Sequence, residues 1–327
     1  MAPMQLIFGA SSFGESRIPT TETAKSFLDV LKKYSVKQVD TAYIYPGFDQ
    51  MTASERILGD LGAGSTEGFV IDTKADCSAP NCQSYDNLMK TIPEQVSRLG
   101  VQSVNILYLH FPDTATAFEE THPALNDLYV QGRFKYLGLS NFKIDQVQVF
   151  LDNAEKRGWV RPTVYQGMYN IVARRIEEDL LPFLKEKGIV FYAYSPLAGG
   201  FFSNIKRGEA PQSGSRYDAD SSVGQLSQKT FYKDSYFAAG DKLRVTGEKF
   251  GLTSNEIAFR WLLNHSFISS SGDAGVLIGA SRISQLEENL RNVENAAPLP
   301  VEVLRVAEEL WELVEKDAPY FSYLDNN

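Results

Sequence analysis

The feature that most limits the fold of this chain is an alternation between short apolar segments and longer amphipathic segments. The apolar segments show little polar alternation, which is typical of strands buried on both faces. We expect strands at Leu6–Gly9, Val36–Asp40, Phe69–Thr73, Val104–Leu109, Phe134–Gly138, Thr163–Tyr165, Ile189–Tyr192 and Gly275–Ile278. We expect helices at Thr21–Lys33, Ala53–Leu61, Tyr85–Leu99, Glu119–Gln131, Ile144–Arg157, Ile176–Lys187, Tyr236–Phe250, Ser254–Leu263, Gln285–Asn292 and Val301–Lys316.

Strands that alternate with helices predict an α/β fold in which a parallel sheet is covered by helices. An open, doubly wound sheet competes with a closed barrel. The number of strands is close to eight, and no G-x-G-x-x-G motif follows the first strand, so we expect a (β/α)8 TIM barrel. We expect a single domain over residues 1–327, with an extra C-terminal helix. The polar segment at about 203–235 is too long for a plain connection, which is typical of a lid, a binding loop or a disordered segment.

Composition and charge exclude several classes of function. The net charge is -9 and the chain has no dense run of Lys and Arg, so we expect no nucleic-acid partner. Two cysteines, Cys77 and Cys82, do not make a disulfide framework or a zinc site, and we expect both to be reduced. The N-terminus does not resemble a signal peptide, and no apolar run is long enough to span a membrane. We therefore expect a cytoplasmic protein with no membrane partner.

Four ionisable side chains follow the ends of three consecutive expected strands. The second strand ends at Asp40, with Tyr45 shortly after it, the third is followed by Lys74, and the fourth by His110. Taken alone, Asp40 could cap a loop, Tyr45 could be a half-buried aromatic and Lys74 a solvated charge. Reactive residues of such barrels lie at the carboxyl ends of the strands, so the four together indicate a catalytic site.

These residue types suit proton transfer to a carbonyl group. A free tyrosine has a pKa near ~10, and a nearby ammonium such as that of Lys74 favours the phenolate and lowers that pKa. Asp40 can hold Lys74 by a salt bridge, and a neutral His110 can orient the substrate oxygen. No side chain can supply a hydride, so the reaction would need a cofactor. The carboxylates and histidines form no recognisable metal-ligand cluster, so we expect no metal.

The later strand ends carry residues suited to a nicotinamide cofactor. Ser140, Asn141 and Gln166 could fix a carboxamide, and the ring of Tyr194 could stack on the nicotinamide. Two further segments could approach the phosphates: Ser195, Pro196, Leu197 and Gly199 after the seventh strand, and Gly279, Ser281, Arg282, Gln285, Glu288 and Asn289 after the eighth. Arg282 could clamp a 2′-phosphate, which would select NADP over NAD, or it could be a surface arginine.

Several segments together resemble the aldo-keto reductase superfamily over nearly the whole chain, from Phe8 to about Tyr320. They are Val39–Ala42 with Tyr45, Ser54-Glu55, Thr73-Lys74, Tyr108–His110, Gly138–Phe142, Tyr165-Gln166, Ala193–Leu197 and Gly279–Asn289. Pro162–Asn170 and Phe191–Gly200 are similar to the aflatoxin-aldehyde reductase branch. The resemblance implies Tyr45 as proton donor, assisted by Lys74, Asp40 and His110. It also implies NADPH/NADP+ bound by Asp40 and the residues named above, together with Arg216.

The chain departs from this branch where the branch usually meets carboxylated aldehydes. Ser227, Gln228 and Thr230 stand where a tyrosine and arginines are usual, and Ser322 stands near a usual terminal arginine. We therefore expect poor activity on succinic semialdehyde and a preference for uncharged aldehydes or ketones. Tyr217, Phe231, Tyr232, Tyr236, Phe321 and Tyr323 would suit an aromatic carbonyl substrate, or they could be packing residues.

Two other functions stay open. Some members of the superfamily, such as potassium-channel β subunits, serve mainly as partners, so the chain could be an NADPH-binding regulatory or scaffold subunit with little turnover. A Rossmann-type dehydrogenase is disfavoured because the glycine fingerprint is missing. Dimers are common among close relatives, which makes a homodimer an option, although no sequence feature requires one.

Overall fold

The computed structural model describes residues 4–322 and has the expected (β/α)8 architecture. Eight parallel strands form a closed barrel in the order of the sequence, which confirms the TIM-barrel prediction. The strands are β1 (Gln5–Gly9), β2 (Gln38–Asp40), β3 (Val70–Lys74), β4 (Val104–Leu109), β5 (Phe134–Ser140), β6 (Pro162–Met168), β7 (Val190–Tyr194) and β8 (Gly275–Ile278).

Most helices lie close to the ranges that the apolar periodicity predicted, whereas the helices at Phe201–Asn204 and Ser222–Phe231 were not expected. The helices are α1 (Thr21–Lys33), α2 (Ala53–Asp60), α3 (Tyr85–Arg98), α4 (Phe118–Val130), α5 (Ile144–Arg157), α6 (Leu180–Glu186), α7 (Phe201–Asn204), α8 (Ser222–Phe231), α9 (Asp234–Phe250), α10 (Ser254–Asn264), α11 (Ile283–Glu294) and α12 (Val301–Val314). In α1, for example, Thr20 caps the first turn and the face that includes Phe27 and Leu31 is buried.

The long polar segment at about 203–235, expected to be a lid, a binding loop or a disordered segment, contains the helix α8. Ser221 caps this helix by accepting a hydrogen bond from the backbone N–H of Gly224. A second difference is the expected helix Ile176–Lys187, which is shorter in the structure. A 3₁₀ turn, η2 (Arg175–Glu177), precedes α6 there. The extra C-terminal helix is present as α12.

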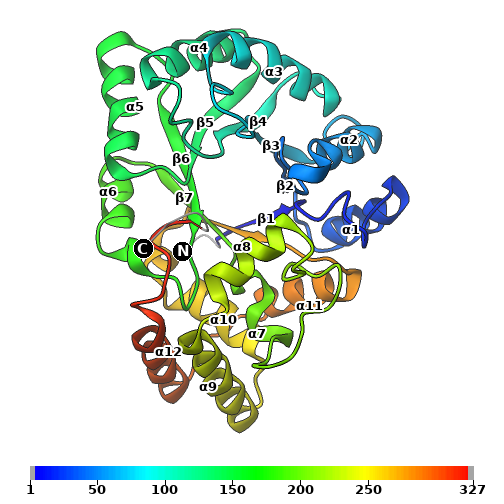
Figure 1. The fold of residues 1–327 in the computed structure, drawn as a ribbon, viewed down its shortest axis with the longest axis vertical. Coiled ribbons are helices and arrows are strands. Elements are labelled where there is room, and N and C mark those ends of the chain that lie inside the picture. Colours follow the sequence, from blue (N-terminus) through cyan, green and yellow to red (C-terminus); the bar gives the residue numbers. More distant parts are fainter. Residues whose placement is uncertain (1–3, 323–327) are drawn as a thin grey trace. The chain divides into compact units, whose positions relative to one another are not determined.

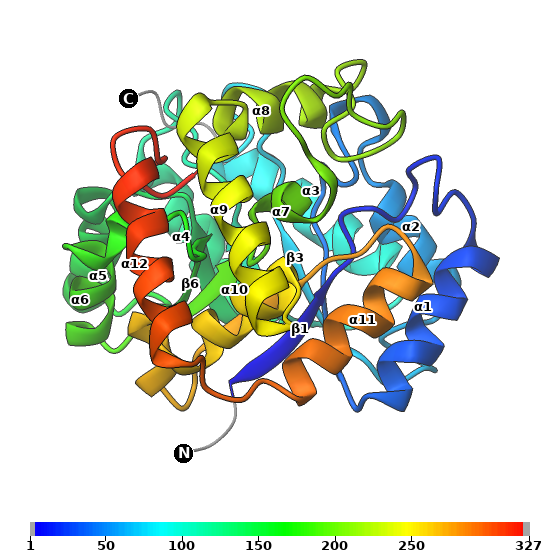
Figure 2. The same cartoon turned by 90° about the horizontal axis from the view of Figure 1, so that it is seen from below.

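The chain divides into two compact units. One unit contains Leu6–Gln166 and Phe183–Val190, and it includes strands β2 to β5 with α1 to α5. Within this unit α3 and α4 lie side by side (Figure 1). The other unit contains Gly167–Pro182 and residues 191–322, and there α9 packs along α12 (Figure 2). The expectation of a single domain stays a prediction.

The register of the strands decides which side chains share a level of the sheet. Asp40 of β2 is the partner of Asp72 in β3, and Lys74 is the partner of Tyr108 in β4. Between β5 and β6, Ser140 is the partner of Gln166, and the register of this pair of strands shifts between Leu137 and Gly138. The polar residues that follow or end these strands are therefore brought to one end of the sheet.

In residues 4–322, no helix is long and apolar enough to cross a membrane. Cys77 and Cys82 are both free thiols. The part of the chain that the structure describes holds no group of three or more His, Cys, Asp or Glu side chains suited to a metal ion. The cytoplasmic location stays a prediction, and the homodimer stays an option.

Candidate active site

Lys74 is the centre of the candidate site, and it is completely buried at the end of β3. Its Nζ lies 2.5 Å from Asp40 Oδ2 and donates to the carbonyl oxygen of Thr41 at 2.9 Å. Burial lowers the pKa of the Lys74 ammonium, but the attraction of Asp40 and of Tyr45 outweighs it, so the pKa lies above its ordinary value. Lys74 is therefore a fixed positive charge in a region from which water is excluded.

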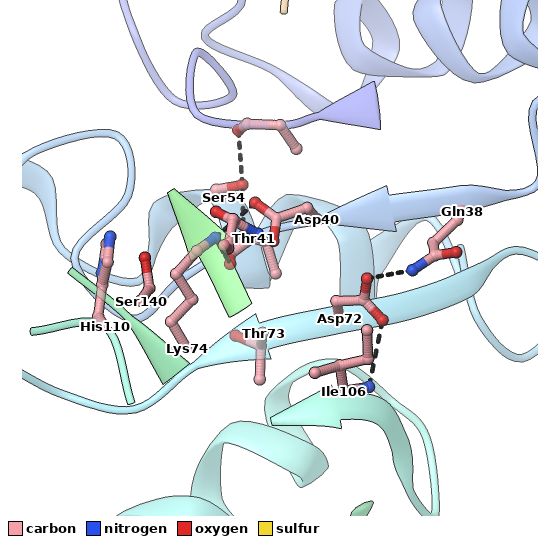
Figure 3. A network of polar contacts seen from close by, with 12 residues as sticks. Gln38, Asp40, Thr41, Ser54, Asp72, Thr73, Lys74, Ile106, His110 and Ser140 are labelled. Atoms are coloured by element: carbon pink, nitrogen blue, oxygen red, sulfur yellow. Dashed lines mark hydrogen bonds and ion pairs between the residues drawn. The ribbon is translucent and has the colours of Figure 1, made fainter. Parts of the chain in front are cut away.

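Tyr45 lies beside this charge, as the sequence predicted. The ring centroid of the half-buried Tyr45 is 4.7 Å from Lys74 Nζ. The segment that carries Tyr45 is held at its base by Ser54, which accepts a hydrogen bond from Thr41 Oγ1 at 2.8 Å and donates to Ala10 O at 2.9 Å. Figure 3 shows Thr41 and Ser54 next to the Asp40–Lys74 pair. These contacts hold the backbone next to the segment that carries Tyr45.

His110 follows β4 and contacts the same tyrosine. Its ring is 5.6 Å from the Tyr45 ring in an edge-on arrangement, and it stacks on Phe111. Burial, and then the charge of Lys74, hold the pKa of the His110 imidazole well below its ordinary value. Among the described residues, its buried Nδ1 has no hydrogen-bond partner. His110 is thus a neutral imidazole, which can orient a polar substrate atom without adding charge.

Ser140, Asn141 and Gln166 continue the site around the strand ends, and all three are buried. Asn141 adopts a left-handed backbone with φ of 63°, and its Nδ2 donates to His110 O at 2.9 Å and to Ser140 Oγ at 3.0 Å. Gln166 Nε2 donates to Asp40 Oδ1 at 3.0 Å. Asp40 is therefore held by Lys74 on one oxygen and by Gln166 on the other.

A second polar network, which the sequence reasoning did not single out, lies on the outer side of β3. The buried Glu55 accepts hydrogen bonds from Thr73 Oγ1 at 2.6 Å and from Gln95 Nε2 at 2.7 Å, and it pairs with Arg98. Gln95 Nε2 also lies 3.0 Å from the carbonyl oxygen of Lys74. This network stabilises the backbone that carries Lys74. The Ser54-Glu55 segment was noted only as part of the resemblance, although a carboxylate on the apolar face of a helix was a usable signal.

Comparison with known proteins agrees with this geometry. The family model described as "Aldo/keto reductase family" matches residues 5–312. The chain belongs to the aldo/keto reductase family. It is 36% identical to the oxidoreductase sirO of Leptosphaeria maculans over 97% of this chain and 96% of that protein. It is 32% identical to the human aldo-keto reductase family 7 member A3, over 96% of both chains.

The aldo-keto reductases that it resembles include members of the expected branch. It is 32% identical to the rat aflatoxin B1 aldehyde reductase member 2, over 91% of this chain and 82% of that protein. The resemblance predicted from the sequence is therefore confirmed. Membership of this family makes the chain an oxidoreductase of an NAD(P)-dependent family.

The remaining expected cofactor residues of this aldo-keto reductase lie in the second unit, after β7 and β8. The turn after β7 has left-handed backbone at Ser195, Ala198, Gly199 and Gly200. Ser195 O accepts from Asn170 Nδ2 at 2.9 Å, and Gly200 N donates to Leu197 O at 2.8 Å. Tyr194 ends β7 and is half-buried, and Pro196 is buried. Consecutive residues of this backbone type can turn their N–H groups toward an anion.

The segment after β8 leads into the N-terminus of α11. Arg282 is exposed at the N-cap position, and no side chain caps this helix end. Ser281 N and Oγ both donate to Gln285 Oε1, at 3.3 and 3.2 Å, and Asn289 Nδ2 donates to Gly279 O at 3.3 Å. Glu288 is exposed. A helix N-terminus without a side-chain cap and with an exposed arginine fits a phosphate group.

The structure shows packing for several of the aromatic residues that could suit an aromatic substrate or pack. Tyr217, Phe231 and Tyr236 are buried and pack around Phe201, so they are packing residues of the second unit. Tyr232 stacks on Tyr217, with ring centroids 5.5 Å apart. Phe321 is also buried, Arg216 is exposed, and Tyr323 lies outside the described residues. The contacts of Tyr217, Phe231 and Tyr236 therefore favour the packing alternative for these three rings.

Proposed function

We propose that this aldo-keto reductase uses NADPH to reduce an uncharged aldehyde or ketone to an alcohol, with Tyr45 as the proton donor. The observation that carries the proposal is the convergence of three side chains from three strand ends. The Lys74 ammonium lies 4.7 Å from the Tyr45 ring, and the neutral His110 lies 5.6 Å from that ring. The same arrangement is open to alcohol oxidation, and an excess of NADPH favours reduction.

In the proposed reaction, a nicotinamide held by the expected cofactor residues would supply the hydride that the carbonyl carbon accepts. The phenol of Tyr45 gives its proton to the carbonyl oxygen, which becomes the alcohol, and a phenolate remains on Tyr45. The ammonium of Lys74 stabilises that phenolate, and Asp40 keeps the ammonium in place. His110 orients the carbonyl oxygen before transfer. Water returns the proton to Tyr45 after the alcohol has left.

We propose that NADPH is held by Asp40, Ser140, Asn141, Gln166, Tyr194, Ser195, Pro196, Leu197, Gly199, Arg216, Gly279, Ser281, Arg282, Gln285, Glu288 and Asn289. The uncapped N-terminus of α11 supports binding of a phosphate there. The exposed Arg282 supports selection of NADPH over NADH, because its guanidinium could pair with the 2′-phosphate that only NADPH carries. Because Gln166 already donates to Asp40, its carbonyl oxygen would be left to meet the carboxamide.

The first test is steady-state oxidation of NADPH with 4-nitrobenzaldehyde, followed at the absorbance band of the reduced cofactor. We expect turnover by the native chain and a loss of roughly 10²–10⁴-fold in kcat in Tyr45→Phe. NADPH binding by both proteins, measured by quenching of protein fluorescence, serves as the control for folding. Tight NADPH binding without turnover of any aldehyde would contradict the proposal and would favour the scaffold function.

The preference for uncharged substrates rests on three positions in α8 that carry no positive charge. Ser227 Oγ donates to Val223 O at 2.9 Å, and Thr230 Oγ1 donates to Leu226 O at 2.9 Å. Gln228 Nε2 donates to Tyr217 O at 2.8 Å. The three side chains satisfy their hydrogen bonds within the segment, and none of them can pair with a carboxylate as an arginine does.

A matched pair of four-carbon aldehydes tests this preference. We expect kcat/KM for butanal to exceed that for succinic semialdehyde, which differs by a terminal carboxylate. Gln228→Arg should raise kcat/KM for succinic semialdehyde by about tenfold, the value of one exposed charge-assisted pair, and leave butanal unchanged. A native preference for succinic semialdehyde would show that the chain binds the carboxylate elsewhere.

A further inference from the structure

Asp72 is a buried carboxylate that the proposed reaction does not use. It belongs to β3, two residues before Lys74, and none of its surface is exposed. Gln38 Nε2 donates a hydrogen bond to Asp72 Oδ2. Asp72 Oδ1 accepts two hydrogen bonds, from Asn105 Nδ2 at 2.8 Å and from the backbone N–H of Ile106 at 3.1 Å. Figure 3 shows Asp72 between Gln38 and Ile106. All three donors are neutral.

A purely structural role does not need the charge of this side chain. Burying an ionised carboxylate costs far more than burying an amide, unless a cation pairs with it. The cost is visible in the pKa of the Asp72 carboxyl, which burial raises to about 7 against the opposing hydrogen bonds from Gln38 and Asn105. Above neutral pH the folded protein therefore contains an ionised Asp72 that costs free energy of folding. The groups around Asp72 indicate what this charge acts on.

Asp72 lies next to the catalytic ion pair. Residues two apart in a strand project to the same face, so the side chains of Asp72 and Lys74 begin about 7 Å apart. Across the sheet, Asp72 is the register partner of Asp40. The charged groups that act on Asp72 are Asp40, which raises its pKa, and Lys74, which lowers it. The neighbouring side chains that contact it from β2 and β4, Gln38 and Asn105, are neutral.

We infer that Asp72 is a positioning residue whose negative charge offsets part of the stabilisation that the Lys74 ammonium gives to the phenolate of Tyr45. This inference rests on the proposed function of Tyr45 as an acid. An ionised Asp72 gives Lys74 a second negative neighbour besides Asp40, so the net positive field at Tyr45 is smaller. Tyr45 then keeps its proton to a higher pH, which preserves the acid that a reductase needs. When Asp72 is protonated, Asp40 alone opposes Lys74.

The direction and size of the effect follow from Coulomb's law. At an effective dielectric constant of about 20, a unit charge at about 10 Å changes the free energy of ionisation enough to move a pKa by about one unit. Removing the charge of Asp72 should therefore move the alkaline limb of kcat to lower pH by about half a unit to one unit. Below about pH 6, where the native Asp72 is protonated, the native and substituted enzymes should behave alike.

Two variants separate the charge of Asp72 from its hydrogen bonds. Asp72→Asn removes the charge and keeps a side chain of the same shape, with its carbonyl oxygen as the acceptor for Asn105 and Ile106, and only the carboxamide of Gln38 must turn to offer its oxygen to the new NH2 group. Asp72→Ala removes the same charge but also leaves the donors of Gln38, Asn105 and Ile106 without their acceptor. We expect both variants to show the same displacement of the alkaline limb, although Asp72→Ala should unfold at a lower temperature. If Asp72→Ala does not fold, Asp72→Asn still tests the displacement.

The ionisation of Tyr45 can also be followed without turnover. An ultraviolet titration of tyrosinate, taken as the difference between each protein and its Tyr45→Phe counterpart, should show the same displacement in Asp72→Asn. Absence of turnover in the native chain would contradict the proposed function and leave this measurement intact. The inference would be overturned if Tyr45 had the same pKa in Asp72→Asn as in the native chain. It would also be overturned if the alkaline limb of kcat moved further in the less stable variant, Asp72→Ala, than in Asp72→Asn.

Discussion

Lys74→Met removes one member of an ion pair that is buried on both sides. Lys74 is fully buried, Asp40 is 1% exposed, and Lys74 Nζ lies 2.5 Å from Asp40 Oδ2. After the substitution, Asp40 keeps the hydrogen bond from Gln166 Nε2 at 3.0 Å, but it has lost its cation. Thr41 O loses the hydrogen bond that Lys74 Nζ donates at 2.9 Å. The variant therefore contains a buried carboxylate without a positive partner.

The expected loss of stability is large. Removing one partner of a buried pair costs about 3–5 kcal/mol, because the remaining charge is not compensated. For a chain of 327 residues, that loss corresponds to a decrease in Tm of roughly 4–7 °C. The decrease should be smaller at acidic pH, where Asp40 can take up a proton and become neutral.

The double variant Asp40→Asn/Lys74→Met separates stability from catalysis. It buries no charge, and replacement of a whole buried ion pair by neutral groups is often neutral for stability or favourable. We therefore expect its Tm, measured by differential scanning calorimetry, to lie above that of either single variant. Its kcat with 4-nitrobenzaldehyde should stay at least about 10²-fold below the native value, because no ammonium stabilises the Tyr45 phenolate.

Two outcomes would refute this reasoning. If the double variant lost as much stability as the two single variants added together, Asp40 and Lys74 would not be energetically coupled. If it regained activity together with stability, the role of Lys74 would be structural and not electrostatic. Asp40→Asn alone, which leaves the ammonium without its carboxylate, completes the cycle.

Three further predictions address other parts of the chain. Gly138→Ala should lower the unfolding free energy by about 1–3 kcal/mol in urea denaturation, because an added Cβ would lie 2.2 Å from the ring of Tyr108. The free energy of unfolding of the native chain should decrease as the pH rises from about 4 to about 7. The folded pKa of Asp72, about 7, lies above that of an unfolded aspartate, so the folded state binds this proton more tightly. A native profile as flat as that of Asp72→Asn would contradict this prediction. Arg282→Ser should raise KM for NADPH by about tenfold or more and leave KM for NADH unchanged, and equal changes for both cofactors would exclude a 2′-phosphate contact.

Patterns within the sequence were sufficient for the architecture and for the strand ends at which the proposed catalytic residues lie. Strands buried on both faces and helices with one apolar face are properties of neighbouring residues, so β4 and α1 could be predicted within a few positions. Closure of eight parallel strands then implied where Asp40, Lys74 and His110 would meet. The convergence of these side chains with Tyr45 agrees with that expectation, and their catalytic roles stay proposals.

What the sequence alone did not determine depends on contacts between segments that are far apart along the chain. Composition could not tell whether Tyr217 and Phe231 line a pocket or pack, because a buried ring has the same local pattern in both cases, and the structure shows packing around Phe201. The structure likewise assigned Gln166 to the second oxygen of Asp40, across 126 positions of sequence. Asp72 became notable only when β2 and β4 brought Asp40, Gln38 and Asn105 next to it. Local periodicity determines which face of a strand is buried, whereas the charges that a buried side chain meets are decided by the register of its neighbours.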